Sequence, residues 1–352
     1  MSSSKYYSSA EALRAAGLPA HPEYAAVEAL YPVQINDYCL KHIDPALGEN
    51  DPFYRQFLPD MAELCDVDSS FDPLAEENQM PVSRLIHRFR DRVVLLATFR
   101  CAARCRFCFR KRIWRSGAVQ EDISDEALAD AVAYLRDNPQ IKEVLISGGD
   151  PLLLGEKRLT QIVSALKTVP DIEIIRMASR LPVVDPEAVT PELIGFMASV
   201  DGLWLATHFN HPAELTPEAE NLLRRIVASG IPVINQSVLL KGVNDDPLIL
   251  EKLFRRLVSL RVKPHYLFHV DPVRGVRHFA TGIERGLEIL RYFRANLSSL
   301  AVPTFAIDLP EGGGKVALQP EYRDEQGRFP DIYDRNYISY CDVMPESGAA
   351  AK

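Results

Sequence analysis

The sequence predicts an α/β protein built as an incomplete (β/α)6 barrel, with an N-terminal helical extension and a short C-terminal segment. Short apolar runs recur from about residue 93 onward, as expected of parallel strands buried on both faces. Helical patterns separate these runs, and six repeats of the alternation indicate parallel βα units. Six units rather than eight leave one side of the barrel open. Active sites in such arrays gather at the carboxyl ends of the strands.

The expected elements follow one another in a regular order along the chain. Two of the helices begin with a Thr-Pro-Glu sequence, at Thr190 and at Thr216, which supplies an N-cap and a proline in the first turn. The expected strands are Val93–Thr98, Glu143–Ser147, Ile172–Met177, Gly202–Thr207, Pro232–Leu239 and Pro264–Val270. The expected helices are Asp125–Asp137, Leu159–Thr168, Pro191–Ala198, Pro217–Ser229, Pro247–Ser259 and Thr281–Asn296.

Three regions are expected along the chain. Residues 1–85 are rich in proline and acids and lack strand alternation, so we expect a helical layer there. Residues 86–300 form the barrel. Residues 301–352 form the C-terminal segment, in which a further strand, Thr304–Asp308, leads into a glycine-rich turn.

Composition excludes several classes of protein. The chain has 352 residues, 47% of them hydrophobic, which is enough for a barrel-sized core. The net charge of −8 argues against nucleic acid as a partner. No run resembles a signal peptide or a membrane span. We therefore expect a cytoplasmic protein, in which thiols stay reduced.

Cys101, Cys105 and Cys108 lie in CAARCRFC, directly after the first expected strand. Thiolates at C-x3-C-x2-C spacing can hold three corners of an iron–sulfur cube and leave the fourth iron open to a small molecule. A structural zinc site normally needs four ligands, and no fourth Cys or suitably spaced His is nearby. A disulfide is disfavoured because the other cysteines are scattered.

Two glycine motifs also follow expected strands. Ser147-Gly148-Gly149-Asp150 ends the second strand, where two glycines allow a close backbone approach to a ligand. An ordinary strand-to-helix turn is an equally good reading of this motif alone. Three glycines precede Lys315, and a lysine there can form a Schiff base with an aldehyde cofactor. On residue chemistry alone, a flexible surface turn is the preferred reading.

An arginine cluster precedes the first strand. The simplest interpretation is a solvent-exposed run of charge formed by Arg88, Arg90 and Arg92. Arginine is also suited to bidentate binding of phosphate.

These motifs together resemble a known family. The CxxxCxxC loop resembles that of the radical S-adenosylmethionine (SAM) superfamily. Over roughly residues 72–320, the chain resembles the lysine 2,3-aminomutases. The segments that carry this resemblance are CRFCFRKR, SGGDPLL, THFNHP, INQSVLLKGVND, HFATGIERGLEILR and PTFAIDLPEGGGKV. The resemblance implies a radical SAM partial (β/α)6 TIM-like barrel. It also implies an isomerase that moves the α-amino group of a cationic amino acid to Cβ, with L-lysine as first choice.

The resemblance implies three cofactors and a set of site residues. A [4Fe–4S] cluster would be held by the three cysteines of the motif, and pyridoxal 5′-phosphate (PLP) by Lys315 with Arg88 and Arg92 nearby. Arg110 would pair with the substrate carboxylate, and Asp271 and Asp308 would hold its distal ammonium. Ion pairing of either aspartate with an arginine such as Arg274 is the alternative. SAM would contact Gly148, Gly149, Asp150, His208 and Gln236.

The resemblance leaves other readings open. Arginine or ornithine as substrate, a β-lysine-forming enzyme for elongation factor P modification, and a non-mutase iron–sulfur electron-transfer or regulatory protein remain alternatives. The family's zinc site is not expected, since Asp246 stands where a cysteine partner occurs in relatives. Phe89 and Phe268 replace tyrosines. We expect a reductant such as flavodoxin or ferredoxin, and a homo-oligomer.

Overall fold

The protein is built around one nine-stranded sheet, in the order β11-β10-β9-β8-β7-β6-β5-β4-β3. This computed structural model describes residues 4–17, 23–115 and 121–340. Strands β4 to β10 run parallel, while β3 and β11 pair antiparallel at the two edges. The parallel strands are β4 (Arg92–Thr98), β5 (Glu143–Gly148), β6 (Ile174–Ala178), β7 (Leu203–Thr207), β8 (Val233–Leu239), β9 (Lys263–His269) and β10 (Thr304–Leu309).

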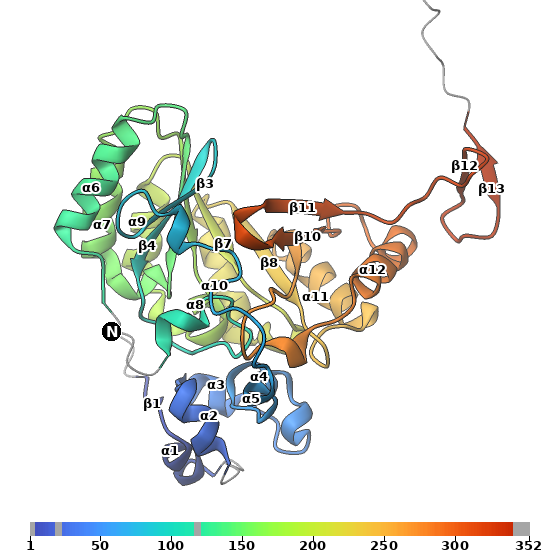
Figure 1. The fold of residues 1–352 in the computed structure, drawn as a ribbon, viewed down its shortest axis with the longest axis horizontal. Helices are drawn as coiled ribbons and strands as arrows, with labels where there is room; N and C mark the ends of the chain where they lie inside the picture. The colour runs from blue at the N-terminus through green and yellow to red at the C-terminus, as the bar shows by residue number, and fades with distance from the viewer. Residues whose placement is uncertain (1–3, 18–22, 116–120, 341–352) are drawn as a thin grey trace, which may run out of the picture.

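Helices follow the strands and cover the outside of the curved sheet (Figure 1). The expected N-caps are confirmed, because Thr190 accepts from the N–H of Leu193 and Thr216 from that of Ala219. All six expected helices and six expected strands are present, and so is the further strand β10. The covering helices are α6 (Asp125–Arg136), α7 (Gly155–Leu166), α9 (Pro191–Ser199), α10 (Pro217–Ala228), α11 (Pro247–Ser259) and α12 (Ile283–Asn296), while the short α8 (Leu181–Val184) lies at the end of β6 next to the N-terminal residues.

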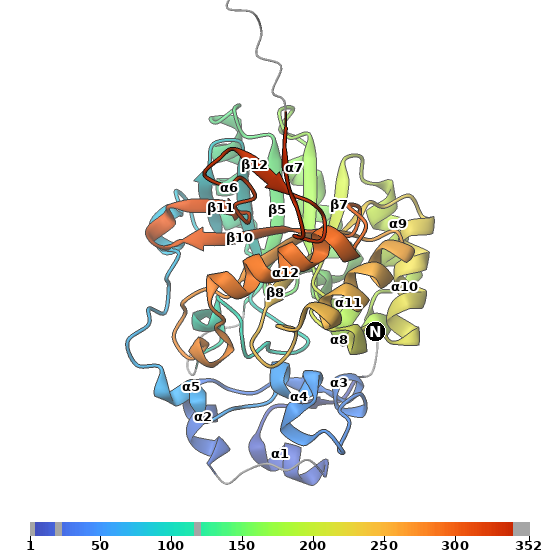
Figure 2. The same ribbon diagram turned by 90° about the vertical axis from the view of Figure 1, so that its right-hand side faces the viewer.

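The N-terminal residues form a layer of short helices beneath the barrel in both views (Figures 1 and 2). The layer contacts loops that follow β6 and β7. The Asn36 amide donates to the Val184 carbonyl, and the Tyr38 hydroxyl bonds to Thr216. Its elements are β1 (Tyr6–Tyr7), α1 (Ala10–Ala15), α2 (Tyr24–Leu30), β2 (Ile35–Asn36), α3 (Asp37–Lys41), α4 (Pro52–Phe57) and α5 (Ala62–Cys65).

Two strands of the main sheet were missed by the sequence patterns. β3 (Leu85–Phe89) pairs with β4, so the expected boundary after residue 85 falls inside a strand. β11 (Gly314–Leu318) pairs with β10, so the preferred reading of the glycine run as a flexible turn was wrong. Positive φ angles at Gly312 (79°), which precedes β11, and at Gly314 (88°), its first residue, turn the chain into the strand.

The C-terminal segment contributes β10 and β11 to the barrel sheet and then leaves it. β12 (Arg328–Pro330) and β13 (Tyr337–Ser339) form a small hairpin that projects from the body (Figure 1). The rest of the expected segment, residues 341–352, lies outside the described residues. Within the described ranges, no helix is both long and apolar enough to cross a membrane.

Candidate active site

The cysteine loop follows β4 and is held from outside by the N-terminal layer. The backbone N–H of Arg104 donates to the Gln34 carbonyl (2.8 Å), and that of Arg106 to the Gln56 carbonyl (2.7 Å). The Gln34 side chain donates to the Cys101 carbonyl. The loop therefore takes its shape from residues more than forty positions earlier in the chain.

A fully buried charge cluster anchors the same loop. The Glu63 carboxylate pairs with Arg106 (2.6 Å) and Lys111 (2.7 Å), and all three side chains have 0% exposure. Burial alone would raise the pKa of Glu63, but the two cations bring it below its ordinary value. Lys111 also donates to the Gly275 carbonyl (2.6 Å), which ties the loop to the segment after β9.

Three thiols from this loop, those of Cys101, Cys105 and Cys108, line one cavity. Burial and then the neighbouring cysteines raise the pKa of Cys101, while burial and Cys105 raise that of Cys108 to about 11. Bound iron supplies the positive charge that such crowded thiols need to ionise. Among the described residues no group of three ligands converges tightly enough for a single ion.

The two glycines of the SGGD motif pack against the start of the cysteine loop. A Cβ on Gly148 would lie 2.1 Å from the Thr98 carbonyl oxygen, and one on Gly149 2.0 Å from that of Arg100. The N–H of Gly149 donates to Thr98 (2.6 Å). Glycine is therefore required at both positions because two backbone segments approach each other closely. The sequence analysis had instead attributed the two glycines to a close approach of the backbone to a ligand.

The Asp150 carboxylate serves the loop after β6. It accepts from the Ser179 hydroxyl (2.8 Å) and from the backbone N–H groups of Arg180 (2.8 Å) and Leu181 (3.0 Å). Burial raises its pKa to about 6 despite these bonds. Its expected contact with the amine of SAM remains a prediction, since its side chain is already engaged.

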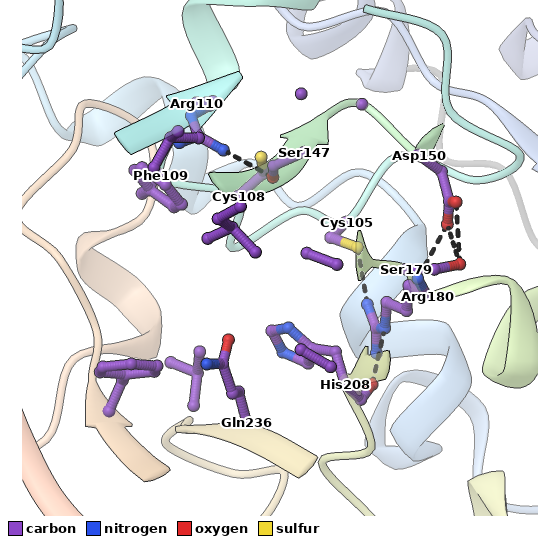
Figure 3. A pocket seen from close by; sticks show the side chains of 18 of the residues that line it. Cys105, Cys108, Phe109, Arg110, Ser147, Asp150, Ser179, Arg180, His208 and Gln236 are labelled. Atoms are coloured by element: carbon purple, nitrogen blue, oxygen red, sulfur yellow. Dashed lines mark hydrogen bonds between the residues drawn. The ribbon is translucent and has the colours of Figure 1, made fainter. Parts of the chain in front are cut away.

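Arg180 reaches from this loop to the cysteines and was missed by sequence reasoning (Figure 3). Its Nη1 donates to Cys105 Sγ (2.6 Å), and its Nη2 donates to Glu214 (2.7 Å) and to Gln56 (2.6 Å). The rule that sites gather at strand ends could have found it, because Arg180 lies two residues beyond β6.

Unpartnered polar atoms face the same cavity from β7. Thr207 Oγ1 and His208 Nε2 are buried without a hydrogen-bond partner among the described residues. Burial and then the Arg180 charge lower the pKa of His208 to about 3, so its ring is neutral. Gln236 lines the cavity from β8, where the strand register shifts (Figure 3). Buried polar atoms without partners are rare, and these fit a polar ligand. The nearby His211 caps the turn that follows, because its Nδ1 accepts from the N–H of Ala213.

Lys315 and Asp308 face each other across the β10–β11 pairing. They are partners in the strand register, and Lys315 Nζ lies 2.8 Å from Asp308 Oδ2. The ammonium also lies over the Phe268 ring, 3.9 Å from its centroid. Burial lowers the pKa of Lys315, and the Asp308 charge opposes this shift.

Asp271 is a second carboxylate that lines the cavity with Asp308, and the two together are called the acidic wall. Among the described residues no side chain forms a hydrogen bond or ion pair with it. Burial and then the Asp308 charge raise its pKa to about 7. Arg274, the arginine named in the alternative interpretation, donates to the backbone carbonyls of Asp66 and Val67. The alternative holds in part for Asp308, which lies 3.9 Å from Arg88.

The expected phosphate arginines differ in their surroundings. Arg88, on β3, donates to the Gln79 side chain (2.7 Å) and lies 3.9 Å from Asp308. Arg92, the first residue of β4, lies over the Phe89 ring and also lines the cavity. Arg90 is exposed in the turn between the strands.

Arg110 is already paired in this structure. Its Nε and Nη2 hold the Glu76 carboxylate (2.9 and 2.7 Å), while its Nη1 lies 3.3 Å from the Ser147 hydroxyl. Burial would raise the pKa of Glu76, but Arg110 and Arg112 lower it to about 2. Sequence reasoning missed Glu76, because nothing in its local sequence marks it.

One cavity of about 560 Å³ joins the cysteine loop to the lysine hairpin. The three thiols, Arg180 and His208 line it together with Arg110, Asp271, Asp308 and Lys315. The cysteine loop and the lysine hairpin, far apart in sequence, thus open onto the same space.

Comparison with known proteins agrees with this arrangement. A model described as the radical SAM superfamily matches residues 95–252, and one described as lysine-2,3-aminomutase matches residues 290–347. A putative L-lysine 2,3-aminomutase of Aquifex aeolicus is 43% identical, over 84% of this chain and 80% of that protein. The L-lysine 2,3-aminomutase of Acetoanaerobium sticklandii is 40% identical, over 88% and 77%. A glutamate 2,3-aminomutase of Clostridioides difficile is 36% identical, over 83% and 69%.

A partial parallel barrel with a three-cysteine loop after its first parallel strand is the architecture of a radical SAM protein. Proteins of this class use SAM and a [4Fe–4S] cluster. Within this class, the chain belongs to the lysine 2,3-aminomutase family.

Proposed function

We propose that the protein is a PLP-dependent radical SAM 2,3-aminomutase that converts L-lysine to β-lysine. The observation that carries the choice of substrate is the acidic wall formed by Asp271 and Asp308. The wall already has a cation beside it, the Lys315 ammonium 2.8 Å from Asp308. A third carboxylate, such as that of a glutamate side chain, would be repelled by this wall, which disfavours glutamate as a substrate.

When bound, the cluster with SAM supplies a carbon radical that abstracts hydrogen, and PLP carries the migrating amine. Cys101, Cys105 and Cys108 would hold the cluster. The unpartnered atoms of His208 and Thr207 would bind SAM, together with Gln236 and the backbone of Gly148, Gly149 and Asp150. For His208 and Thr207, this assignment would give a polar ligand partner to buried atoms that have none among the described residues.

Lys315 is our candidate for the PLP lysine. Burial lowers its pKa, which increases the share of the neutral, nucleophilic amine. The ring of Phe268 lies beside its Nζ. Arg88 and Arg92 line the cavity nearby and would supply positive charge for the phosphate.

The remaining charges would orient the amino acid. Glu76 fixes the guanidinium of Arg110 through Nε and Nη2. Nη1 donates to the Ser147 hydroxyl in a longer bond (3.3 Å), and this edge would turn to the substrate carboxylate. Asp271 and Asp308 would hold the distal ammonium. The residues then position substrate and cofactors within one partly closed space, which is the protein's main contribution to such chemistry.

Anaerobic incubation with reductant, SAM and PLP tests the proposal. L-lysine, L-arginine, L-ornithine and L-glutamate are supplied separately, and products are separated by chromatography and identified by mass. We expect β-lysine from L-lysine and no product from L-glutamate. A β-amino product from L-arginine or L-ornithine alone would reassign the substrate, and conversion of L-glutamate would contradict the acidic-wall argument.

A further inference from the structure

We propose that Arg180 is a positioning residue that raises the reduction potential of the iron–sulfur cluster through its hydrogen bond to Cys105. The inference rests on the proposed function, because it requires the cysteine loop to hold a cluster. It concerns a residue outside the cysteine motif.

Arg180 lies in direct contact with one cysteine sulfur. Its Nη1 donates to Cys105 Sγ at 2.6 Å, and its side chain is only 10% exposed. A charged donor makes the stronger type of hydrogen bond, and little solvent is present to screen it. The guanidinium also stays charged at any ordinary pH.

The arginine is fixed by several independent contacts. Its Nε donates to the His208 carbonyl (3.3 Å), and its Nη2 donates to Gln56 and Glu214. The rings of Phe57 and Phe107 lie 4.7 and 5.0 Å from its guanidinium carbon. The guanidinium therefore has one well-defined position, which it holds without help from a ligand.

Its backbone is fixed as well. Asp150 accepts from the N–H groups of Arg180 and Leu181, and this carboxylate belongs to the SGGD motif. The motif at the end of β5 thereby aims a side chain from the loop after β6 at the cysteines (Figure 3). Asp150 therefore also positions Arg180, besides any contact that it makes with SAM.

The effect on the cluster follows from charge. Cluster potentials depend on net charge and on hydrogen bonds to the sulfurs. One-electron reduction adds a negative charge to the cluster without making or breaking a bond at Arg180. A nearby positive donor stabilises the reduced form more than the oxidised form, so the potential rises. Glu214, which is fully buried, offsets part of the arginine's charge.

The two residues therefore predict shifts of opposite sign. The cluster is reconstituted anaerobically, SAM is left out, and the reduced fraction is followed by electron paramagnetic resonance during a redox titration. Arg180→Gln should shift the potential to more negative values, and Arg180→Lys should shift it less. Glu214→Gln should shift it to more positive values, because Arg180 keeps its Gln56 and aromatic contacts. Arg158→Gln, which removes a surface partner of Asp125, should match the wild type.

Every other result of these titrations either supports or contradicts the role proposed for Arg180. Equal potentials in Arg180→Gln and wild type, with equal iron content, would overturn the inference, even if SAM affinity fell. Shifts of the same sign in Arg180→Gln and Glu214→Gln would indicate a merely structural role. If Arg180→Gln held no cluster, Arg180→Lys and Glu214→Gln would decide by the same signs. A wild-type protein that holds no cluster would instead refute the proposed function.

Discussion

The two ends of the cavity are built in different ways. At the cysteine end, charges are buried and balanced: Glu63 with Arg106 and Lys111, and Arg180 with Glu214. At the lysine end, no cation among the described residues pairs with Asp271, and both its pKa and that of Lys315 are displaced by burial. The first end is completed by the protein itself, whereas the second leaves charge to be satisfied by what binds there.

The largest effect should come from the cysteine end. Cys105→Ala removes one of three cluster ligands, so iron content and aminomutase activity should fall to background while circular dichroism stays unchanged. Cys65→Ala, at an exposed cysteine, is the matched control and should retain both. Activity in protein without a cluster would contradict the radical assignment.

At the lysine end, Asp308→Ala should impair substrate binding and leave the cluster intact. Removing one partner of a buried charge contact costs about 2–5 kcal/mol. The KM for L-lysine should therefore rise roughly 30-fold or more. Reductive cleavage of SAM, measured without amino acid, should stay near the wild-type rate. In the surface variant Asp201→Ala, the KM for L-lysine and the rate of SAM cleavage should both stay near the wild-type values. Equal loss of both activities would indicate a structural role for Asp308.

Stability should separate the two ends in the opposite sense. Glu63→Gln leaves two buried cations without their counter-charge, and breaking such a pair costs about 3–5 kcal/mol of unfolding free energy. Asp271→Asn removes the charge of a partly buried carboxyl that has no partner among the described residues, and it should be neutral or stabilising. Urea unfolding of the apoproteins measures both. A destabilisation by Asp271→Asn as large as that by Glu63→Gln would remove the distinction between the ends.

The sequence patterns predicted the cysteine loop and the SGGD turn, because each follows a strongly apolar strand and strand ends meet at one face. Asp308, which lies inside β10, was indicated only by the family resemblance. They did not reveal Arg180 or Glu76, whose roles depend on partners 75 and 34 residues away. They also missed β11, because glycines that serve the turn at Gly312 and Gly314 mimic a flexible loop. Long-range ion pairing leaves no local signal.

The smallest expected effect is a pH dependence at the lysine end. The pKa of Asp271 is raised to about 7, so the carboxyl loses its charge as the pH falls through 7. Affinity for the cationic side chain should fall by up to about tenfold per pH unit below that point. Calorimetry on PLP-loaded protein without reductant measures it, and Asp271→Asn should remove this component. A slope unchanged in Asp271→Asn would contradict the assignment.

The central claim is that the cavity facing the cysteines also contains the lysine that binds PLP. Borohydride reduction of the PLP-loaded protein, followed by proteolysis and mass spectrometry, locates the modified residue. We predict PLP on Lys315, with none on the buried Lys111. Attachment to another lysine, or to none, would contradict the account.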